Sequence, residues 1–347
     1  MTYLYLNFDA EEELARPAPL RPVDRSARAL AALARGAEAL APLLPTHLVP
    51  LLPSAATSAA GAAGAQRALT PGAALLWCPT AAAVAEVAAL GLTPCSARAL
   101  ALDAGAAASG AGAGCVTDGL ALPTEAALSA ANDRATFAAR SPLPGGVIAR
   151  TFEEVERALL AGAPGARWLL RRGLSANGRG ARRVWSGAAL PPGDAEWLRA
   201  ALRPGAVTCD PFVTITREFA LHGWLDAQGE VSLGVPCLQV VDEHGGWRAT
   251  RRLAGDAVRG PREHGAREHG AREHGADEHG ADEHRLLDAL SAAARDVAAT
   301  LHQLRYHGPF GIDAYEWRDD DGALRLRAPS EVNARFSLGW WVGMLPR

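Results

Sequence analysis

Apolar positions in the first third of the chain predict an open α/β domain. Two segments are predicted to be strands, because apolar and polar residues alternate in one and the other is a short continuous apolar run. Two other segments carry apolar residues at the spacing of a helix. Thr80 would cap the second helix and Gly91 would end it. The predicted strands are 2–8 and 74–78, and the predicted helices are 26–44 and 81–90. Their order favours an α/β fold over about residues 1–120, followed by a loop rich in Ala and Gly at 104–114.

From about residue 123 the pattern changes to helices and short paired strands. We expect one helix over 124–140, with Asn132, Asp133 and Arg134 in its middle. The remaining predicted helices are 151–161 and 194–202, and the predicted strands are 166–172, 182–186, 207–213, 217–225 and 231–241. This part divides into a small lobe, about 121–205, and a C-terminal lobe, about 206–347.

A five-residue repeat, PREHGAREHGAREHGADEHGADEH, occupies residues 261–284. Its histidines could bind zinc, nickel or copper. A five-residue period, however, advances by about 140° around a helix axis with each repeat and so spreads the imidazoles around the axis, and the glycines weaken a helix. We therefore expect a disordered insert before an amphipathic helix that starts near Leu286.

The last predicted hairpin carries the candidate chemistry. Its strands are 310–317 and 324–335, joined by a turn at 319–322. Glu331, Asn333 and Arg335 are two apart, so in a strand they share one face, and Asp313 lies in the partner strand. Two carboxylates and an amide oxygen suit Mg²⁺, and an arginine can neutralise a phosphoryl group. The alternative is the solvated outer face of an edge hairpin.

GPFGIDAYEW followed by EVNARFS resembles the metal-binding hairpin of the ATP-grasp superfamily, which includes D-alanine–D-alanine ligases and biotin carboxylases. The resemblance covers about residues 131–339 and implies an ATP-grasp fold of two lobes after an α/β pre-ATP-grasp domain. It implies that Asp313, Glu331 and Asn333 bind two Mg²⁺ ions, for which Mn²⁺ could substitute. Arg335 would stabilise the phosphoryl group or a tetrahedral intermediate.

Upstream segments match the nucleotide-binding parts of the same family. WLLRRGLSANGRGARRV resembles the strand and glycine-rich loop that cover the ATP phosphates, with Arg171 where the family usually has lysine. Gly178, Arg179 and Gly180 would form the loop, and Arg179 would act beside Arg335 in catalysis. Arg134 matches a second nucleotide-contacting lysine. Taken alone, the loop is also compatible with a plain hairpin turn and Arg134 with a surface arginine.

CDPFVTITREF resembles the hinge that binds the adenosine. The match implies that Asp210, Phe212 and Val213 line the adenine and that Glu218 binds the ribose. Ordinary packing of an edge strand is the alternative for each of these residues.

Composition narrows the functional classes. The net charge of −3 gives no general attraction for nucleic acid or membranes, and no segment resembles a signal peptide or a membrane helix. We expect a cytoplasmic protein whose five scattered cysteines are reduced. The sequence has no lysine, so arginine must serve wherever lysine is usual. Trp340 and Trp341 could line a substrate pocket, pack in the core or form an oligomer contact, which leaves a homodimer open.

The resemblance implies an ATP-dependent ligase that joins a small-molecule carboxylate to an amine through an acyl phosphate, releasing ADP and phosphate. An enzyme that forms ester or amide cross-links in a ribosomal peptide is one alternative. A nucleotide-binding scaffold is another, because arginine replaces both lysines and the chain ends soon after NARFSLGWW. A carboxylase would need biotin or bicarbonate, and no residue identifies either.

Overall fold

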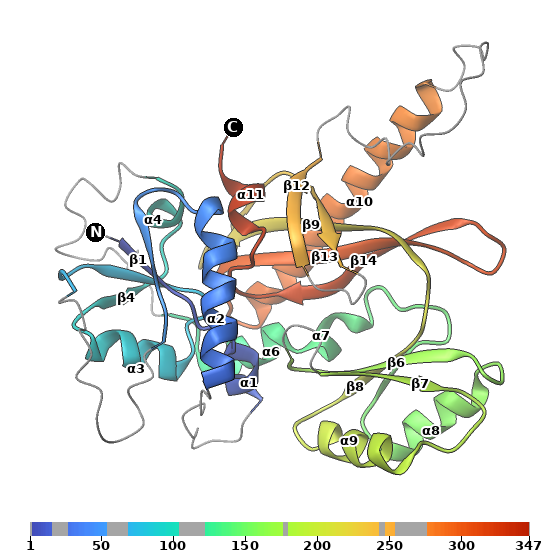
Figure 1. Cartoon of the computed structure of the whole chain (residues 1–347). Coiled ribbons are helices and arrows are strands. Elements are labelled where there is room, and N and C mark those ends of the chain that lie inside the picture. Colours follow the sequence, from blue (N-terminus) through green and yellow to red (C-terminus); the bar gives the residue numbers. More distant parts are fainter. Residues whose placement is uncertain are drawn as a thin grey trace.

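Three sheets organise the computed structural model (Figure 1), which describes residues 2–15, 27–53, 69–103, 122–175, 180–242, 247–253 and 276–346. The N-terminal sheet is parallel and has the order β2-β1-β3-β4. The second sheet, in the order β5-β8-β6-β7, and the third, in the order β12-β11-β9-β13-β14, are antiparallel. The expected α/β fold class is thus confirmed, with a parallel N-terminal sheet followed by two antiparallel lobes.

The N-terminal domain follows the predicted strand and helix order. Thr80 caps α3 by accepting a hydrogen bond from the Ala83 amide, and Gly91 follows that helix at φ 73°, where a residue with a Cβ would be strained. The Glu13 carboxylate accepts from the Thr80 hydroxyl and the Ala82 amide, which ties two elements together. The elements are β1 (Thr2–Tyr5), α1 (Ala10–Leu14), α2 (Ala27–Leu40), η1 (Ala41–Leu43), β2 (Leu48–Leu51), β3 (Ala73–Leu76), α3 (Ala81–Ala89), β4 (Thr93–Cys95) and α4 (Arg98–Leu102).

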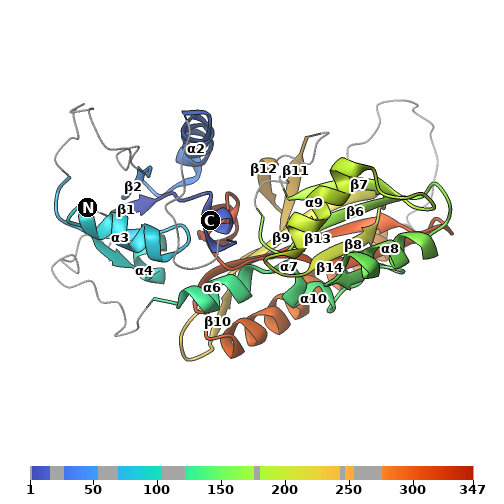
Figure 2. The ribbon, with the colours of Figure 1, turned by 90° about the horizontal axis from the view of Figure 1, so that it is seen from below.

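The small lobe is a four-stranded sheet with two helices on one face (Figure 2). Thr151 and Glu154 form a capping box at the start of α8, as the sequence predicts. Buried residues such as Val155, Leu170 and Leu198 form a core that is separate from the rest of the molecule. The elements are β5 (Val147–Ala149), α8 (Phe152–Ala161), β6 (Arg167–Arg172), β7 (Ala181–Trp185), α9 (Pro192–Leu202) and β8 (Val207–Pro211).

The expectation of a single helix over residues 124–140 is wrong. The chain forms α6 (Glu125–Asn132) and α7 (Arg134–Ala138), which meet at Asp133. Asp133 has extended backbone angles (φ −74°, ψ 118°), and its side chain accepts from the Ala135 amide. An aspartate is a strong N-cap because its short carboxylate satisfies an amide at a helix start. The break therefore turns Arg134 into the first residue of a new helix.

The central sheet carries the predicted C-terminal hairpin in the middle of the fold. Its elements are β9 (Ile215–Leu225), β10 (Val231–Leu233), β11 (Cys237–Val241), β12 (Trp247–Arg252), β13 (Gly308–Arg318) and β14 (Leu324–Asn333), with α11 (Trp340–Met344) after them. The strand expected over 231–241 is two strands, which both pair with β9. Pro236 lies between them and has no amide hydrogen for a sheet.

The helix α10 (Ala276–Gln303) packs on β9, β13 and β14. It begins inside the histidine repeat, so the expectation of a disordered insert is wrong for residues 276–284. Extending a helix whose later turns are already packed needs no new nucleus, so its backbone can continue upstream through the glycine at 280. The rest of the repeat and the loop expected at 104–114 lie outside the described residues.

An aromatic cluster joins the N-terminal domain to the central sheet. The Phe336 ring stacks on Trp341 at a centroid distance of 4.7 Å and meets Trp340 edge-on at 4.9 Å. Trp77 of the N-terminal domain lies 6.4 Å from both Phe336 and Trp341, and the Phe336 amide donates to the Trp77 carbonyl. Both indoles at 340 and 341 are fully buried, which favours core packing over a substrate pocket for these side chains.

The described residues also bear on the predicted state of the cysteines and on the predicted lack of membrane helices. Cys78, Cys95, Cys209 and Cys237 form no disulfide among the described residues and are buried, as expected of reduced thiols that pack as small apolar groups, while Cys115 lies outside the described residues. Among the residues described, no helix is both long and apolar enough to cross a membrane.

Phe336→Ala should lower the free energy of unfolding by about 3–5 kcal/mol, because it leaves a cavity where the domain and the sheet meet. Leu160→Ala is the control, since Leu160 is 70% exposed, and it should change stability by less than about 0.5 kcal/mol. Urea unfolding followed by tryptophan fluorescence measures both changes. Equal shifts for the two variants would contradict the packing role of Phe336.

Candidate active site

Asp313 and Glu331 are direct cross-strand partners in the β13–β14 hairpin. Side chains of such partners lie on the same face of a sheet with their Cβ atoms about 5 Å apart. The Asn333 side-chain amide donates to Asp313 Oδ2 at 2.9 Å, so the third predicted ligand belongs to the same group. The structure therefore brings Asp313, Glu331 and Asn333 together, as the sequence predicts, while their role in binding metal stays a prediction.

The two facing carboxylates have opposite electrostatic environments. Burial, and then the charge of Glu331, raise the pKa of Asp313 to about 7. Burial also raises the pKa of Glu331, but the guanidinium groups of Arg134, Arg171 and Arg335 outweigh it and hold that pKa below its usual value. Close carboxylates that repel each other form a donor set that a divalent cation would relieve. The residues present thus fit Mg²⁺.

Arg134 connects the hairpin to the small lobe. Its Nη2 and Nε donate to the two oxygens of Glu331 at 2.8 and 3.3 Å. Its Nη1 donates to the Arg172 carbonyl at 3.0 Å and the Ser175 hydroxyl at 2.7 Å, where the glycine-rich loop begins. The Arg134 side chain is only 10% exposed. Arg134 is therefore a buried bridge between the lobes and not a helix-surface arginine.

Arg171 lies between the hinge strand and the hairpin. Its Nη2 donates to Asp210 Oδ2 at 2.8 Å, and its charge also lowers the pKa of Glu331. Asp210 is bound on its other side by Arg327 of β14, whose Nη1 and Nη2 lie 3.2 and 3.3 Å from the two carboxylate oxygens. Asp210 thus holds one arginine from each lobe.

The sequence pattern did not indicate Arg327. Arg327 pairs across the hairpin with Tyr315, and the register shifts between this pair and the pair of Asp313 and Glu331. Tyr315 in turn pairs with Glu218, which places Arg327 in the row next to the candidate ligands. Pro329 interrupts the alternation of polar residues between Glu331 and Arg327, so side-chain periodicity carries little signal for this arginine.

Arg335 lies just past the end of β14 and contacts the N-terminal domain. Its Nε donates to Glu11 Oε1 of α1, and its Nη1 donates to the Phe336 carbonyl at 3.1 Å. It lowers the pKa of both Asp313 and Glu331, although burial and the charge of Glu331 still keep that of Asp313 raised. The Asn132 side chain binds the Ala334 amide and fixes the backbone here. Arg335 is therefore held at the site by a carboxylate that the sequence did not indicate.

The predicted hinge residues connect the small lobe to the central sheet. The Phe212 amide donates to the Arg167 carbonyl, and the Phe212 ring lies under the Arg167 guanidinium at 4.5 Å. Val213 is partly exposed. Burial raises the pKa of Glu218, which lies on the same face of the sheet as Asp313. Contacts of these residues with adenosine stay predictions.

Only part of the glycine-rich loop can be placed. Gly178 and Arg179 lie outside the described residues. Gly180 is described, and its carbonyl accepts from the Arg172 amide at 2.9 Å. A Cβ on Gly180 would lie 2.2 Å from the Ser175 Cβ, so only glycine fits at this point of the loop.

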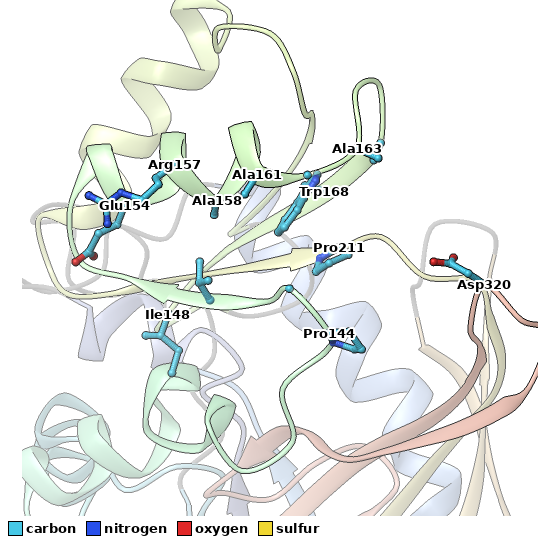
Figure 3. Close-up of a pocket in the computed structure, with 14 residues that line it drawn as sticks. Pro144, Ile148, Glu154, Arg157, Ala158, Ala161, Ala163, Trp168, Pro211 and Asp320 are labelled. Carbon is cyan, nitrogen blue, oxygen red and sulfur yellow. The ribbon is translucent and has the colours of Figure 1, made fainter.

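A separate cavity of about 550 Å³ lies at the end of the small lobe (Figure 3). It is lined by α8, β5 and Trp168 of β6, with Pro211 and Asp320 at its edge. None of the residues predicted to act on ATP lines it, so it is distinct from the candidate site.

Comparisons with known proteins give structural similarities alone. Neither the comparison with protein-family models nor that with curated proteins finds a match. A biotin carboxylase–βγ-ATP complex from Campylobacter jejuni matches with a TM-score of 0.47 at 12% identity over 100% of this chain and 72% of that one. D-alanyl-alanine synthetase A from Vibrio cholerae matches with a TM-score of 0.45 at 12% identity, over 100% of this chain and 92% of that one.

An N5-carboxyaminoimidazole synthetase from Staphylococcus aureus complexed with ADP also matches. Its TM-score is 0.37 at 11% identity, over 62% of this chain and 48% of that one. This chain thus spans about half the length of that synthetase.

Asp313→Asn should stabilise the ligand-free protein more at pH 8 than at pH 5. With a pKa of about 7, folded Asp313 holds a proton that an unfolded aspartate releases near pH 4. The folded state therefore binds more protons between these values, and its stability falls as the pH rises through them. Asparagine removes this loss. Thermal unfolding at the two pH values measures it, with exposed Asp320→Asn as the control. The same change at both pH values would contradict the raised pKa.

Proposed function

We propose that this chain is an ATP-dependent carboxylate–amine ligase that forms an amide or peptide bond through an acyl phosphate. The observation that supports it is the facing pair Asp313 and Glu331, which Asn333 joins by a hydrogen bond and to which arginines direct positive charge. Carboxylate and amide oxygens beside arginines suit a magnesium nucleotide.

The metal would be held by Asp313, Glu331 and Asn333. When bound, Mg²⁺ would neutralise the phosphates and make the γ-phosphorus more susceptible to attack. Among the described residues, no three His, Cys, Asp or Glu side chains form a metal-binding group. Two acids and an amide leave coordination positions for phosphate oxygens, which is how Mg²⁺ is commonly bound in nucleotide enzymes.

The arginines would orient the reacting groups. Arg134 and Arg171 reach the hairpin from α7 and β6, where they would bind phosphate oxygens. A substrate carboxylate oxygen then attacks the γ-phosphorus, and the bond to the β-phosphate oxygen breaks to give ADP and an acyl phosphate. Arg335 would stabilise the charge that develops on the transferring group.

The second step joins the acyl group to the amine. The amine nitrogen attacks the acyl carbon, phosphate leaves, and the nitrogen loses a proton to give the amide. Arg335 and backbone amides of the loop would stabilise the tetrahedral oxyanion. The reaction needs no nucleophilic side chain, because both nucleophiles come from the substrates.

Release of ADP and phosphate from Mg·ATP in the presence of pooled carboxylates and amines tests this function. Wild type should release both products at a rate that depends on both pools. Glu331→Ala should lose more activity than the about 10- to 100-fold typical of an outer-shell partner, because it removes a direct ligand. Exposed Glu153→Gln on α8 is the matched control and should keep full activity.

Two other outcomes would overturn the proposal. If wild type and Glu331→Ala both remain at background while ATP still binds, the chain is a nucleotide-binding scaffold. If neither protein binds Mg·ATP, the assignment to this type of enzyme fails altogether.

A further inference from the structure

Asp210 binds two arginines at the junction of the lobes. Arg327 reaches it from β14, and Arg171 reaches it from β6 of the small lobe. The side chains of Asp210 and Arg327 are only 7% and 3% exposed, and that of Arg171 is 17% exposed. Two cations therefore share one carboxylate in a largely closed space.

Arg327 is fixed in place. Besides its two contacts with Asp210, its Nε donates to the Ser141 carbonyl at 2.8 Å and its Nη1 donates to the Tyr315 hydroxyl at 3.1 Å. Its guanidinium also lies against the Tyr315 ring, 5.9 Å from the centroid. Leaving this position would break contacts to three residues.

The Arg171 side chain has fewer contacts than that of Arg327. The only hydrogen bond of its side chain among the described contacts goes to Asp210, and its buried Nε has no partner in the described structure. It is also the more exposed of the two arginines, and its charge acts on Glu331. Of the two cations on Asp210, Arg171 is therefore the one that can turn toward an anion in the site.

We propose that Arg327 is a positioning residue for the nucleotide: it stays on Asp210 as a permanent counter-ion, so that Arg171 can leave Asp210 and bind a phosphate of ATP. This role rests on the proposed nucleotide site. Without Arg327, the departure of Arg171 would leave Asp210 buried and unpaired, which is strongly unfavourable. Arg171 would then remain on Asp210, and nucleotide binding would weaken.

Titration of the whole chain with Mg·ADP by isothermal calorimetry tests the exchange. Arg327→Met should weaken ADP binding by about 10- to 100-fold, the value of one hydrogen bond between charged groups. Arg327→Lys should lose less, because it keeps the charge but not the two-pronged contact. Arg325→Met is the matched control, since Arg325 lies on the same strand, is 60% exposed and pairs with Asp319. It should bind ADP like wild type.

A double variant separates positioning from a merely structural role. Arg327→Met with Asp210→Asn leaves no carboxylate to retain Arg171, so Arg327→Met should weaken ADP binding little or not at all when Asp210→Asn is already present. If Arg327→Met weakens binding as much in the Asp210→Asn protein as in wild type, or if Arg327→Met binds like wild type while wild type binds ADP, the exchange is wrong. If wild type binds no ADP, the proposed function fails and the exchange fails with it.

Discussion

Two carboxylates that face each other across a hairpin repel, and the surroundings of Asp313 and Glu331 are arranged around that repulsion. In this structure it is relieved in two ways. Asp313 takes up a proton more readily than an ordinary aspartate, and Glu331 is bound by Arg134. At the proposed site, a divalent cation and a phosphate group would supply the same kinds of charge.

The lobes are joined differently on the two sides of this hairpin. On one side the Phe336 cluster packs the N-terminal domain against the central sheet, and such apolar contacts do not exchange partners. On the other side the small lobe keeps its own core and meets the hairpin through Arg134 and Asp210. Apolar packing therefore supports the carboxylates on one side, and largely buried ion pairs join the small lobe to them on the other.

Local signals predicted much of this structure. The capping box at Thr151, the cap at Thr80 and both hairpins are formed by residues close in sequence, and all occur as expected. The errors arose where a helix cap or the packing of a helix overrode a longer pattern. Asp133 ended a helix that apolar spacing continued, because a carboxylate can satisfy an amide at a helix start. The long helix α10 reached into the histidine repeat because its later turns were already packed.

Alternation along one strand was enough to place Glu331 and Asn333 on a common face, and the sequence could pair them with Asp313 because a short turn joins the two strands. It could not show that Arg134 binds Glu331, that Arg335 is held by Glu11, or that Asp210 is shared by two arginines. The first contact joins residues 197 positions apart and the second joins residues 324 positions apart. The two arginines on Asp210 lie 39 and 117 positions from it. Side-chain periodicity is a property of neighbouring residues and is written in the sequence. Which distant charges become partners depends on how the lobes pack, and only the tertiary structure decided it.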